Sequence, residues 1–231
     1  SGLGEDSALK ELEGILSRFF GVFDTLFGAY DEARSGMKEE LWADISAEDR
    51  GTAAIVTGCR NTASVDAETN AGGVVGAISI DLSFDREDEY SIADFLSGEA
   101  RYFISATLRD CVSTASVTAR KSAAGGIVGR MDYGAVSGCE ASGAVTAAGS
   151  YAGGIAGYSA GRLEGCAARV SLEGESYLGG IAGLGHDILD CLAMPDFLTS
   201  GAYQGSVAGE ADGAVSGNRY AGSPVGGVNG F

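Results

Sequence analysis

Five cysteines and one histidine are the residues of this chain whose types could support metal binding or covalent catalysis. No two cysteines form a C-x-x-C pair, and no Cys/His cluster occurs, whereas a zinc site needs four such ligands at short spacings. We therefore expect no metal and no other cofactor. A single histidine without a nearby nucleophile does not make a catalytic triad, so we expect His186 to be a solvated turn residue.

Acidic side chains offer a second chemistry, because some parallel β-helices cleave acidic polysaccharides with clustered aspartates beside Arg or Lys. The candidates are Asp66, Asp132, Asp187 and Asp190. They fall at different positions of the repeat described below, so we do not expect them to converge on one face. The Gly-Gly-x-Gly-x-Asp nonapeptide of calcium-binding β-helices is also absent from the sequence. These patterns favour a protein that is not an enzyme.

Tyr151, Tyr177 and Tyr203 are spaced 26 residues apart, and each lies two residues before a glycine. If equivalent segments stack on one another, the three rings form a column. A flat aromatic column suits stacking on sugar rings or docking a protein partner. It is equally suited to a structural stack whose hydroxyls point into water, and the spacing does not choose between these uses.

The elements that must position these residues repeat along the chain. The strings "AGGVVGA", "AAGGIVG", "SYAGGIAG", "SYLGGIAG" and "AYQGSVAG" recur, and their first glycines lie at Gly72, Gly125, Gly153, Gly179 and Gly205. The cysteines mark a second register, at Cys59, Cys111, Cys139, Cys166 and Cys191. A unit of about 26–28 residues built from short apolar segments between Gly, Ser and Asp turns indicates one coil of a solenoid.

The predicted fold is an all-β solenoid, a parallel β-helix of about five coils of 26–28 residues with an N-terminal α-helical cap. We expect glycine to avoid clashes between coils and to permit positive φ, and Val128, Ile155 and Ile181 to form an interior ladder. A second ladder follows each cysteine by six residues, at Val65, Val117, Val145, Leu172 and Phe197. We expect the cysteines to be buried free thiols, with disulfides or a reactive site as the alternatives.

The strings "YAGGIAGY", "AAGGIVGR" and "YLGGIAGL", each after a "C-x-x-x-A-x-V"-like strand, resemble the GLUG motif. The resemblance covers roughly residues 52–230. GLUG repeats occur in large bacterial surface and secreted proteins, including some IgA-directed metallopeptidases, where they lie outside the catalytic domain. The resemblance implies an extracellular or cell-surface β-solenoid used for display, spacing or adhesion. It departs from the motif at Gly205-Ser206, where the second glycine is missing, and in the doubled gap between the first two units.

The formal net charge of -17 excludes some classes of partner. Nucleic-acid binding needs clustered Lys and Arg, and an anionic membrane surface repels such a chain. No apolar run is long enough to span a bilayer. We expect a piece of a longer protein, because the chain opens without an initiator Met. Its partners would then be neighbouring domains of the parent protein and, as alternatives, a host or cell-wall glycan or protein.

Two segments interrupt the repeat pattern. Residues 1–50 are predicted to be a helical cap or linker, because Leu9, Leu12, Leu16 and Phe19 begin a stripe of helical spacing within 6–34. That stripe could cover the N-terminal end of the solenoid or pair with another helix. Residues 51–231 are predicted to be the solenoid, with an arm inserted at about 80–108. The alternative is that the strands around the insertion extend a coil and only its acidic middle projects.

Overall fold

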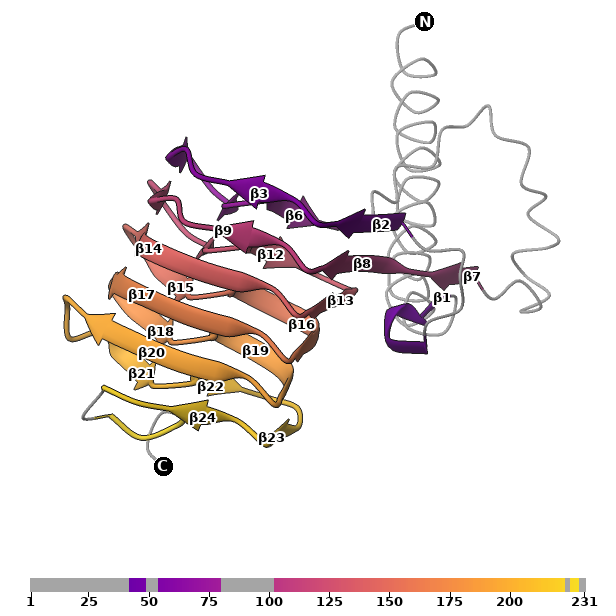
Figure 1. The fold of residues 1–231 in the computed structure, drawn as a ribbon. Coiled ribbons are helices and arrows are strands. Elements are labelled where there is room, and N and C mark those ends of the chain that lie inside the picture. Colours follow the sequence, from indigo (N-terminus) through magenta and orange to yellow (C-terminus); the bar gives the residue numbers. More distant parts are fainter. Residues whose placement is uncertain (1–41, 49–53, 80–101, 223–224, 229–231) are drawn as a thin grey trace, which may run out of the picture. The chain divides into compact units, whose positions relative to one another are not determined.

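The computed structural model describes residues 42–48, 54–79, 102–222 and 225–228 (Figure 1). The predicted helix at 6–34 and most of the predicted arm lie outside these residues. The chain divides into two compact units, one of Ser1–Ala43 with Glu89–Phe103 and one of Asp44–Asp88 with Ile104–Phe231. Strands β1 (Trp42–Asp44) and β7 (Tyr102–Ile104) pair to form a two-stranded sheet.

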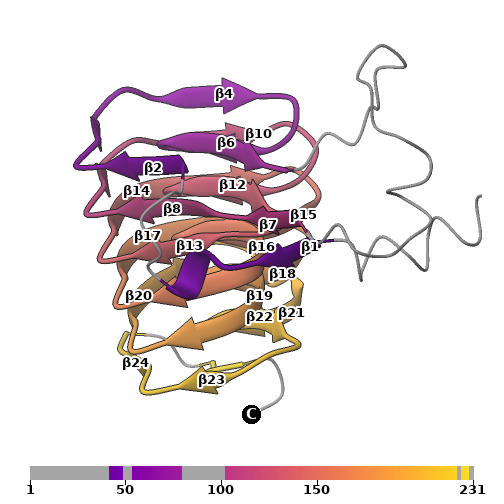
Figure 2. The same cartoon turned by 90° about the vertical axis from the view of Figure 1, so that its right-hand side faces the viewer.

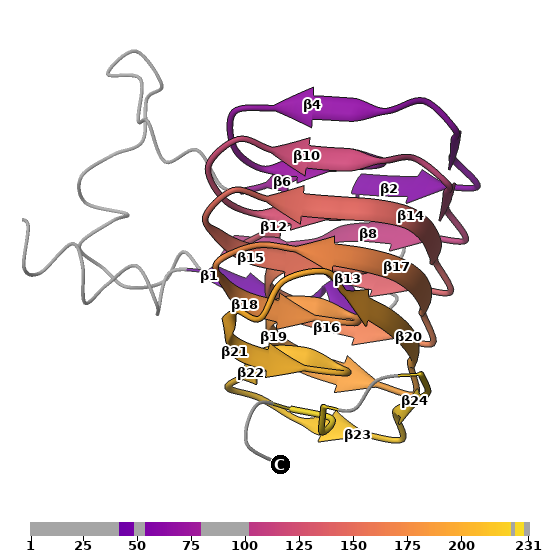
Figure 3. The same ribbon diagram turned by 90° about the vertical axis from the view of Figure 1, so that its left-hand side faces the viewer.

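The second unit is an all-β solenoid in which the chain winds through three sheets, and neighbouring strands of its described residues pair in parallel (Figures 2 and 3). The first sheet has eight strands: β3 (Arg60–Asn61), β4 (Val65–Ala67), β9 (Val112–Ser113), β10 (Val117–Ala119), β14 (Glu140–Ala147), β17 (Ala167–Glu173), β20 (Leu192–Phe197) and β24 (Arg219–Tyr220). The second has five: β5 (Ala71–Gly72), β11 (Ala124–Gly125), β15 (Ser150–Gly153), β18 (Ser176–Gly179) and β21 (Ala202–Gly205).

The third sheet has nine strands: β2 (Ala54–Thr57), β6 (Val75–Ile78), β8 (Ala106–Arg109), β12 (Val128–Met131), β13 (Ala135–Ser137), β16 (Ala156–Glu164), β19 (Ala182–Leu189), β22 (Ala208–Ala211) and β23 (Val215–Ser216). The five rungs of the second sheet, from β5 to β21, correspond to about four full turns of the chain. The predicted β-solenoid is therefore confirmed. Among the described residues the one helical segment is a 3-10 turn, η1 (Ser46–Glu48).

The apolar ladder that follows the cysteines is confirmed. Val117 pairs with Val65 on one side and with Val145 on the other, and Leu172 continues the ladder. The side chains of Val117 and Leu172 are fully buried. The other predicted ladder was misplaced by one residue, because the backbone of Ile155 bonds to that of Ile127 and Ile181, so Ile127 and not Val128 belongs to it. Val128 instead pairs with Val75 and Ala156.

The repeated first glycines allow the coils to approach closely, as expected. A Cβ placed on Gly153 would lie 1.9 Å from the carbonyl oxygen of Ala156 and 2.6 Å from the amide nitrogen of Gly183. The same contact with the oxygen three residues later recurs at the other four first glycines. The expectation of positive φ at these glycines was wrong. The left-handed residue lies two positions earlier in each coil, where the chain enters the second sheet.

The predicted arm ends earlier than residue 108. Strand β8 pairs with β2 on one side and with β13 on the other, so residues 106–109 belong to the solenoid wall. The predicted N-terminal segment likewise contributes to this wall, since Asp44 accepts a hydrogen bond from the Gly134 amide at 2.7 Å and Ser46 accepts one from the Ala106 amide at 2.9 Å.

Candidate binding surface

Three tyrosines share a left-handed backbone conformation at the corner where each coil enters the second sheet. Tyr151, Tyr177 and Tyr203 have φ values of 69°, 56° and 57°. The same position carries Asn70 and Ala123 in the first two coils, with φ of 53° and 64°. Asparagine and glycine adopt this conformation readily, but a bulky side chain there is a genuine outlier. Such a position points to a selective reason for keeping the ring.

The three rings, which we call the tyrosine ladder, stack on one another along the solenoid. The ring centroids of Tyr177 and Tyr203 are 4.6 Å apart with an interplanar angle of 2°, and those of Tyr151 and Tyr177 are 4.9 Å apart at 30°. Both separations match the spacing of about 4.8 Å between neighbouring strands. The predicted column is therefore present.

Stacking changes what the ladder presents to solvent. Each ring covers part of the face of the next, so the ladder shows mainly ring edges and hydroxyls along its length. Tyr203 ends the ladder, and it is 44% exposed. Tyr151 and Tyr177 are half-buried, so Tyr203 is the most exposed of the three tyrosines.

A second column runs beside the ladder on the outer surface of the third sheet. Arg130, Tyr158, Leu184 and Glu210 are successive partners in register on β12, β16, β19 and β22. Tyr158 packs edge-on against Tyr151, with centroids 5.9 Å apart at 78°. The sequence prediction missed this column, although each of its last three members follows a ladder tyrosine by seven residues.

Arginine closes the N-terminal end of this aromatic surface. The guanidinium carbon of Arg130 lies 4.6 Å from the centroid of the Tyr158 ring, a cation–π distance. Arg130 also donates to Asp132 at 2.7 Å, which holds the guanidinium in place. At the other end the charge is reversed. Desolvation, together with the nearby Glu210 carboxylate and the two flanking tyrosines, raises the pKa of the Tyr177 hydroxyl.

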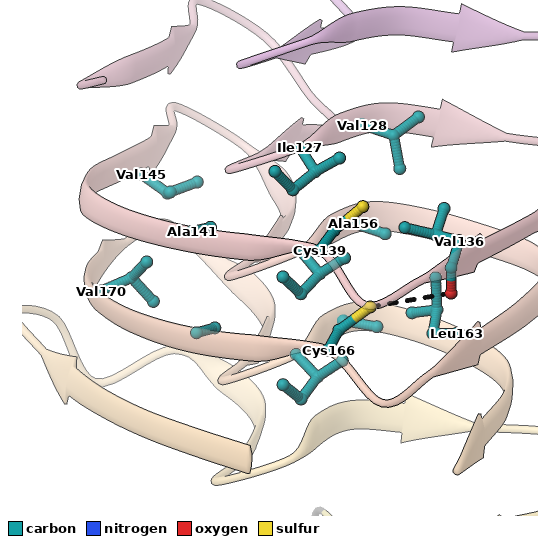
Figure 4. Close-up of a cluster of buried hydrophobic side chains, with 14 of the residues drawn as sticks. Ile127, Val128, Val136, Cys139, Ala141, Val145, Ala156, Leu163, Cys166 and Val170 are labelled. Carbon is teal, nitrogen blue, oxygen red and sulfur yellow. Dashed lines mark hydrogen bonds between the residues drawn. The ribbon is translucent and has the colours of Figure 1, made fainter. Parts of the chain in front are cut away.

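The cysteines form a buried ladder of free thiols. Cys111, Cys139, Cys166 and Cys191 are 0–1% exposed and each thiol contacts a carbonyl of the preceding coil, as Cys166 does with Val136 at 3.7 Å (Figure 4). Cys59 departs from the prediction, since it is exposed.

Neighbouring thiols of the ladder affect one another's pKa. The interaction between Cys139 and Cys166 lowers the pKa of the Cys139 thiol and raises that of the Cys166 thiol. Burial is the main cause that raises the pKa of Cys111. Because the four thiols are buried, we assign them a structural role.

Asn218 ends the cysteine ladder, and the sequence prediction missed it. It lies in the coil after Cys191, where its side-chain oxygen accepts a hydrogen bond from the Cys191 amide at 2.8 Å and its nitrogen donates to Ile188 O at 2.6 Å. The Cys191 thiol accepts in the same way from the Cys166 amide at 3.4 Å. The strings "SGC" at 137–139 and "SGN" at 216–218 carried the signal.

The remaining candidate residues are dispersed. Asp66 pairs with Arg120 at 3.0 Å on the first sheet, while Asp132 pairs with Arg130 on the third. His186 lies in strand β19 and not in a turn, and its Nδ1 is 2.9 Å from Asp212. Asp187 accepts a hydrogen bond from the Ala214 amide, and Asp190 is the left-handed residue before Cys191. Within residues 42–48, 54–79, 102–222 and 225–228 no group of His, Cys, Asp and Glu is arranged to hold a metal ion.

The described part of the solenoid has two shallow surface depressions, one of about 310 Å³ beside Phe197 and Gln204 and a more apolar one of about 280 Å³. The apolar depression is lined by residues of β2, β6 and β8, among them Val56, Ile78 and Leu108, and by Tyr133. Its lining offers no group of converging charged side chains. No helix in the described part of the chain is long and apolar enough to cross a membrane.

No family model, curated protein or solved structure matches this chain.

Proposed function

We propose that this chain is a non-enzymatic β-solenoid module of a larger bacterial cell-surface or secreted protein, akin to the GLUG repeats that its sequence resembles. In that protein it serves as a spacer that carries an adhesive corner. The observation that carries the proposal is the register of the coils, in which Gly72, Gly125, Gly153, Gly179 and Gly205 lie on successive rungs. A solenoid of this kind extends by about 4.8 Å for each coil and repeats the same outward side chain at that interval.

The charge distribution supports a spacer. Exposed ion pairs join neighbouring coils where β4 and β10 of the first sheet end, between Arg120 and Asp66 at 3.0 Å and between Lys121 and Glu68 at 2.6 Å. Pairs this exposed contribute little to stability, because water screens them. The excess of acidic groups, with a net charge of -17, keeps copies of the module apart through mutual repulsion.

The surface location is tested by labelling intact cells that produce the parent protein, with an antibody raised against the folded chain. Labelling of intact cells, or recovery of the antigen from the culture medium, is expected. Signal that emerges only after the cells are permeabilised would contradict the proposal. An antibody against a cytoplasmic protein of the same cells serves as the control for leakage.

A second function, binding of a glycan or a protein, is favoured by the ladder tyrosines. Three bulky residues occupy a left-handed position that Asn70 and Ala123 occupy in other coils, so packing alone does not require tyrosine there. Aligned tyrosine edges and hydroxyls are common at binding surfaces. Binding to glycan arrays and to cell surfaces should fall at least about tenfold in Tyr177→Ala.

The matched control for that experiment is Leu184→Ala, which removes the neighbouring side chain of the second column and keeps the ladder. Both variants should remain folded, because the register accepts alanine at Ala123 on the ladder position and at Ala77 on the outer column. Equal binding by wild type and Tyr177→Ala would overturn the binding role.

A further inference from the structure

We propose that the C-terminal end of the tyrosine ladder is a binding site for a guanidinium group, supplied by an arginine side chain of a basic protein partner. The inference rests on the binding role proposed above and names the chemistry of its ligand. The site consists of the Tyr203 ring and the Glu210 carboxylate.

The chain itself contains an example of the contact. At the N-terminal end of the aromatic surface the Arg130 guanidinium lies 4.6 Å from the Tyr158 ring centroid and is paired with the carboxylate of Asp132 at 2.7 Å. A ring on one side and a carboxylate on the other satisfy both the flat face and the charge of a guanidinium. Tyr203 and Glu210 present the same two groups at the opposite end without an arginine of this column beside them.

Register places these two groups together. Tyr203 lies in line with Tyr177, and Glu210 lies in line with Leu184 and, one coil further, with Tyr158. Tyr203 and Glu210 therefore occupy the same two positions of their coil as Tyr151 and Tyr158 occupy in theirs. The rings of Tyr151 and Tyr158 are in contact, with their centroids 5.9 Å apart. In addition to this geometry, the Glu210 carboxylate is one of the causes that raise the pKa of the Tyr177 hydroxyl, which supports its proximity to the ladder.

The exposure of Tyr203 and the negative charge of Glu210 indicate which class of ligand the site binds. Tyr203 is 44% exposed, whereas Tyr151 and Tyr177 are half-buried, so the last tyrosine of the ladder is the one accessible to a ligand. A planar cation continues the stack at the spacing of one rung, whereas an anion is repelled by Glu210 and by a chain of net charge -17. A neutral sugar ring fits the aromatic face but makes no use of the carboxylate.

The test titrates the full chain with a short capped peptide that contains one arginine, and with matched peptides that contain lysine or citrulline. Binding is followed by the NMR signals of the tyrosine rings. We expect saturable shifts at Tyr203, with roughly fivefold tighter binding of the arginine peptide than of the citrulline peptide. Arginine should also bind more tightly than lysine, because only its planar group stacks on the ring.

Two variants locate the site. Tyr203→Ala should abolish the saturable shifts of the neighbouring Tyr177 ring, and Glu210→Gln should weaken binding roughly threefold, with less dependence on salt. Tyr220→Ala, which removes a similarly exposed ring on β24, should bind as wild type does.

The outcomes separate the two levels of the proposal. Equal affinity for the arginine and citrulline peptides, or affinity unchanged in Tyr203→Ala, would overturn the guanidinium site. If glycan binding is then lost in Tyr177→Ala and kept in Glu210→Gln, the ladder binds sugar and only the ligand class is wrong. If Tyr177→Ala changes the binding of no ligand, the binding role itself fails.

Discussion

At the scale of single residues, the left-handed tyrosines combine two opposing effects. A non-glycine residue in this conformation costs roughly 1–2 kcal/mol, and an aromatic pair in favourable geometry returns about 0.5–1.5 kcal/mol. The two terms are similar in size, so stacking makes the ladder tolerable without making it a major source of stability. Because stability alone does not explain the rings at Tyr151, Tyr177 and Tyr203, the balance favours a binding role for them.

The ionisation of Tyr177 gives a first prediction. Its pKa lies above the ordinary value of 10.0 because of desolvation and then of Glu210. A tyrosine whose pKa is higher in the folded state stabilises that state at low pH, and the contribution is lost as pH rises from about 10 through the folded pKa. The difference in absorbance at alkaline pH between wild type and Tyr177→Phe should report this late titration.

Glu210→Gln supplies the control for that titration. Removing the carboxylate should move the midpoint assigned to Tyr177 to lower pH, because one of the charges that disfavours the phenolate is gone. A midpoint at or below that of free tyrosine in the wild-type protein would contradict the electrostatic account of the ladder.

Thiol accessibility gives a second prediction. Cys59 is exposed and the other four cysteines are buried, and a buried thiol is shielded from reagents in solution. A colorimetric thiol reagent should therefore modify one thiol in the native protein and all five in denaturant. Cys59→Ser should reduce the native count to zero, and rapid modification of several native thiols would argue against the dry ladder.

At the scale of elements, each coil depends on two devices. Glycine permits close backbone approach at the turn out of the second sheet, and the residue at the cysteine position caps the coil above it through its side chain. Both devices act between coils, so a change in one coil is felt by its two neighbours. Gly153 and Asn218 test them separately.

Gly153→Ala should destabilise the protein by about 3 kcal/mol or more, because the added Cβ meets backbone atoms at 1.9 and 2.6 Å that belong to rigid rungs. Gly165→Ala is the matched control. That glycine has φ of 61° but nothing within 4 Å of an added Cβ, so only the conformational cost of about 1–2 kcal/mol applies. Urea denaturation of the two variants measures the difference, and equal losses would show that the close approach is not what glycine provides.

Asn218→Ala should cost about 1–3 kcal/mol, since it leaves the Cys191 amide and the Ile188 carbonyl without their partners. Asn218→Cys should recover part of this loss, because a thiol makes the equivalent contacts in the preceding coils. Thermal unfolding compares the three proteins. If the alanine and cysteine variants are equally stable, Asn218 does not complete the ladder.

At the scale of the whole molecule, the solenoid behaves as a stack in which each coil contacts only its neighbours, so its ends have fewer partners than its middle. The buried core reflects this. Val117, Val145 and Leu172 are 0–1% exposed, whereas Val65 and Phe197 at the two ends of the same ladder are only partly buried. Among the described residues, six of the seven exposed large apolar side chains lie in the last coils, between Leu192 and Tyr220.

Native-state hydrogen exchange should therefore show a gradient along the solenoid. Amides of β14 and β17, which are paired on both sides, should exchange most slowly, and those of β23 and β24 should exchange fastest. Leu172→Ala, at a fully buried position, should cost about 2–5 kcal/mol and speed exchange in the coils on both sides. Uniform protection from β3 to β24 would indicate a single cooperative unit instead.

The repeat spacing by itself determined the solenoid, the ladder through Val117 and Leu172, the buried thiols and the column of tyrosines, because residues one coil apart must stack. The tertiary structure decided everything that depends on which coil is an end and where side chains point. Cys59 is exposed because it lies in the first coil, Tyr203 offers a ring face because it ends the ladder, and β8 joins the wall because it pairs with strands distant in sequence. Neither end effects nor pairings across an insertion are local properties of a repeat, so Arg130, Glu210 and Asn218 acquired their roles only from the assembled coils.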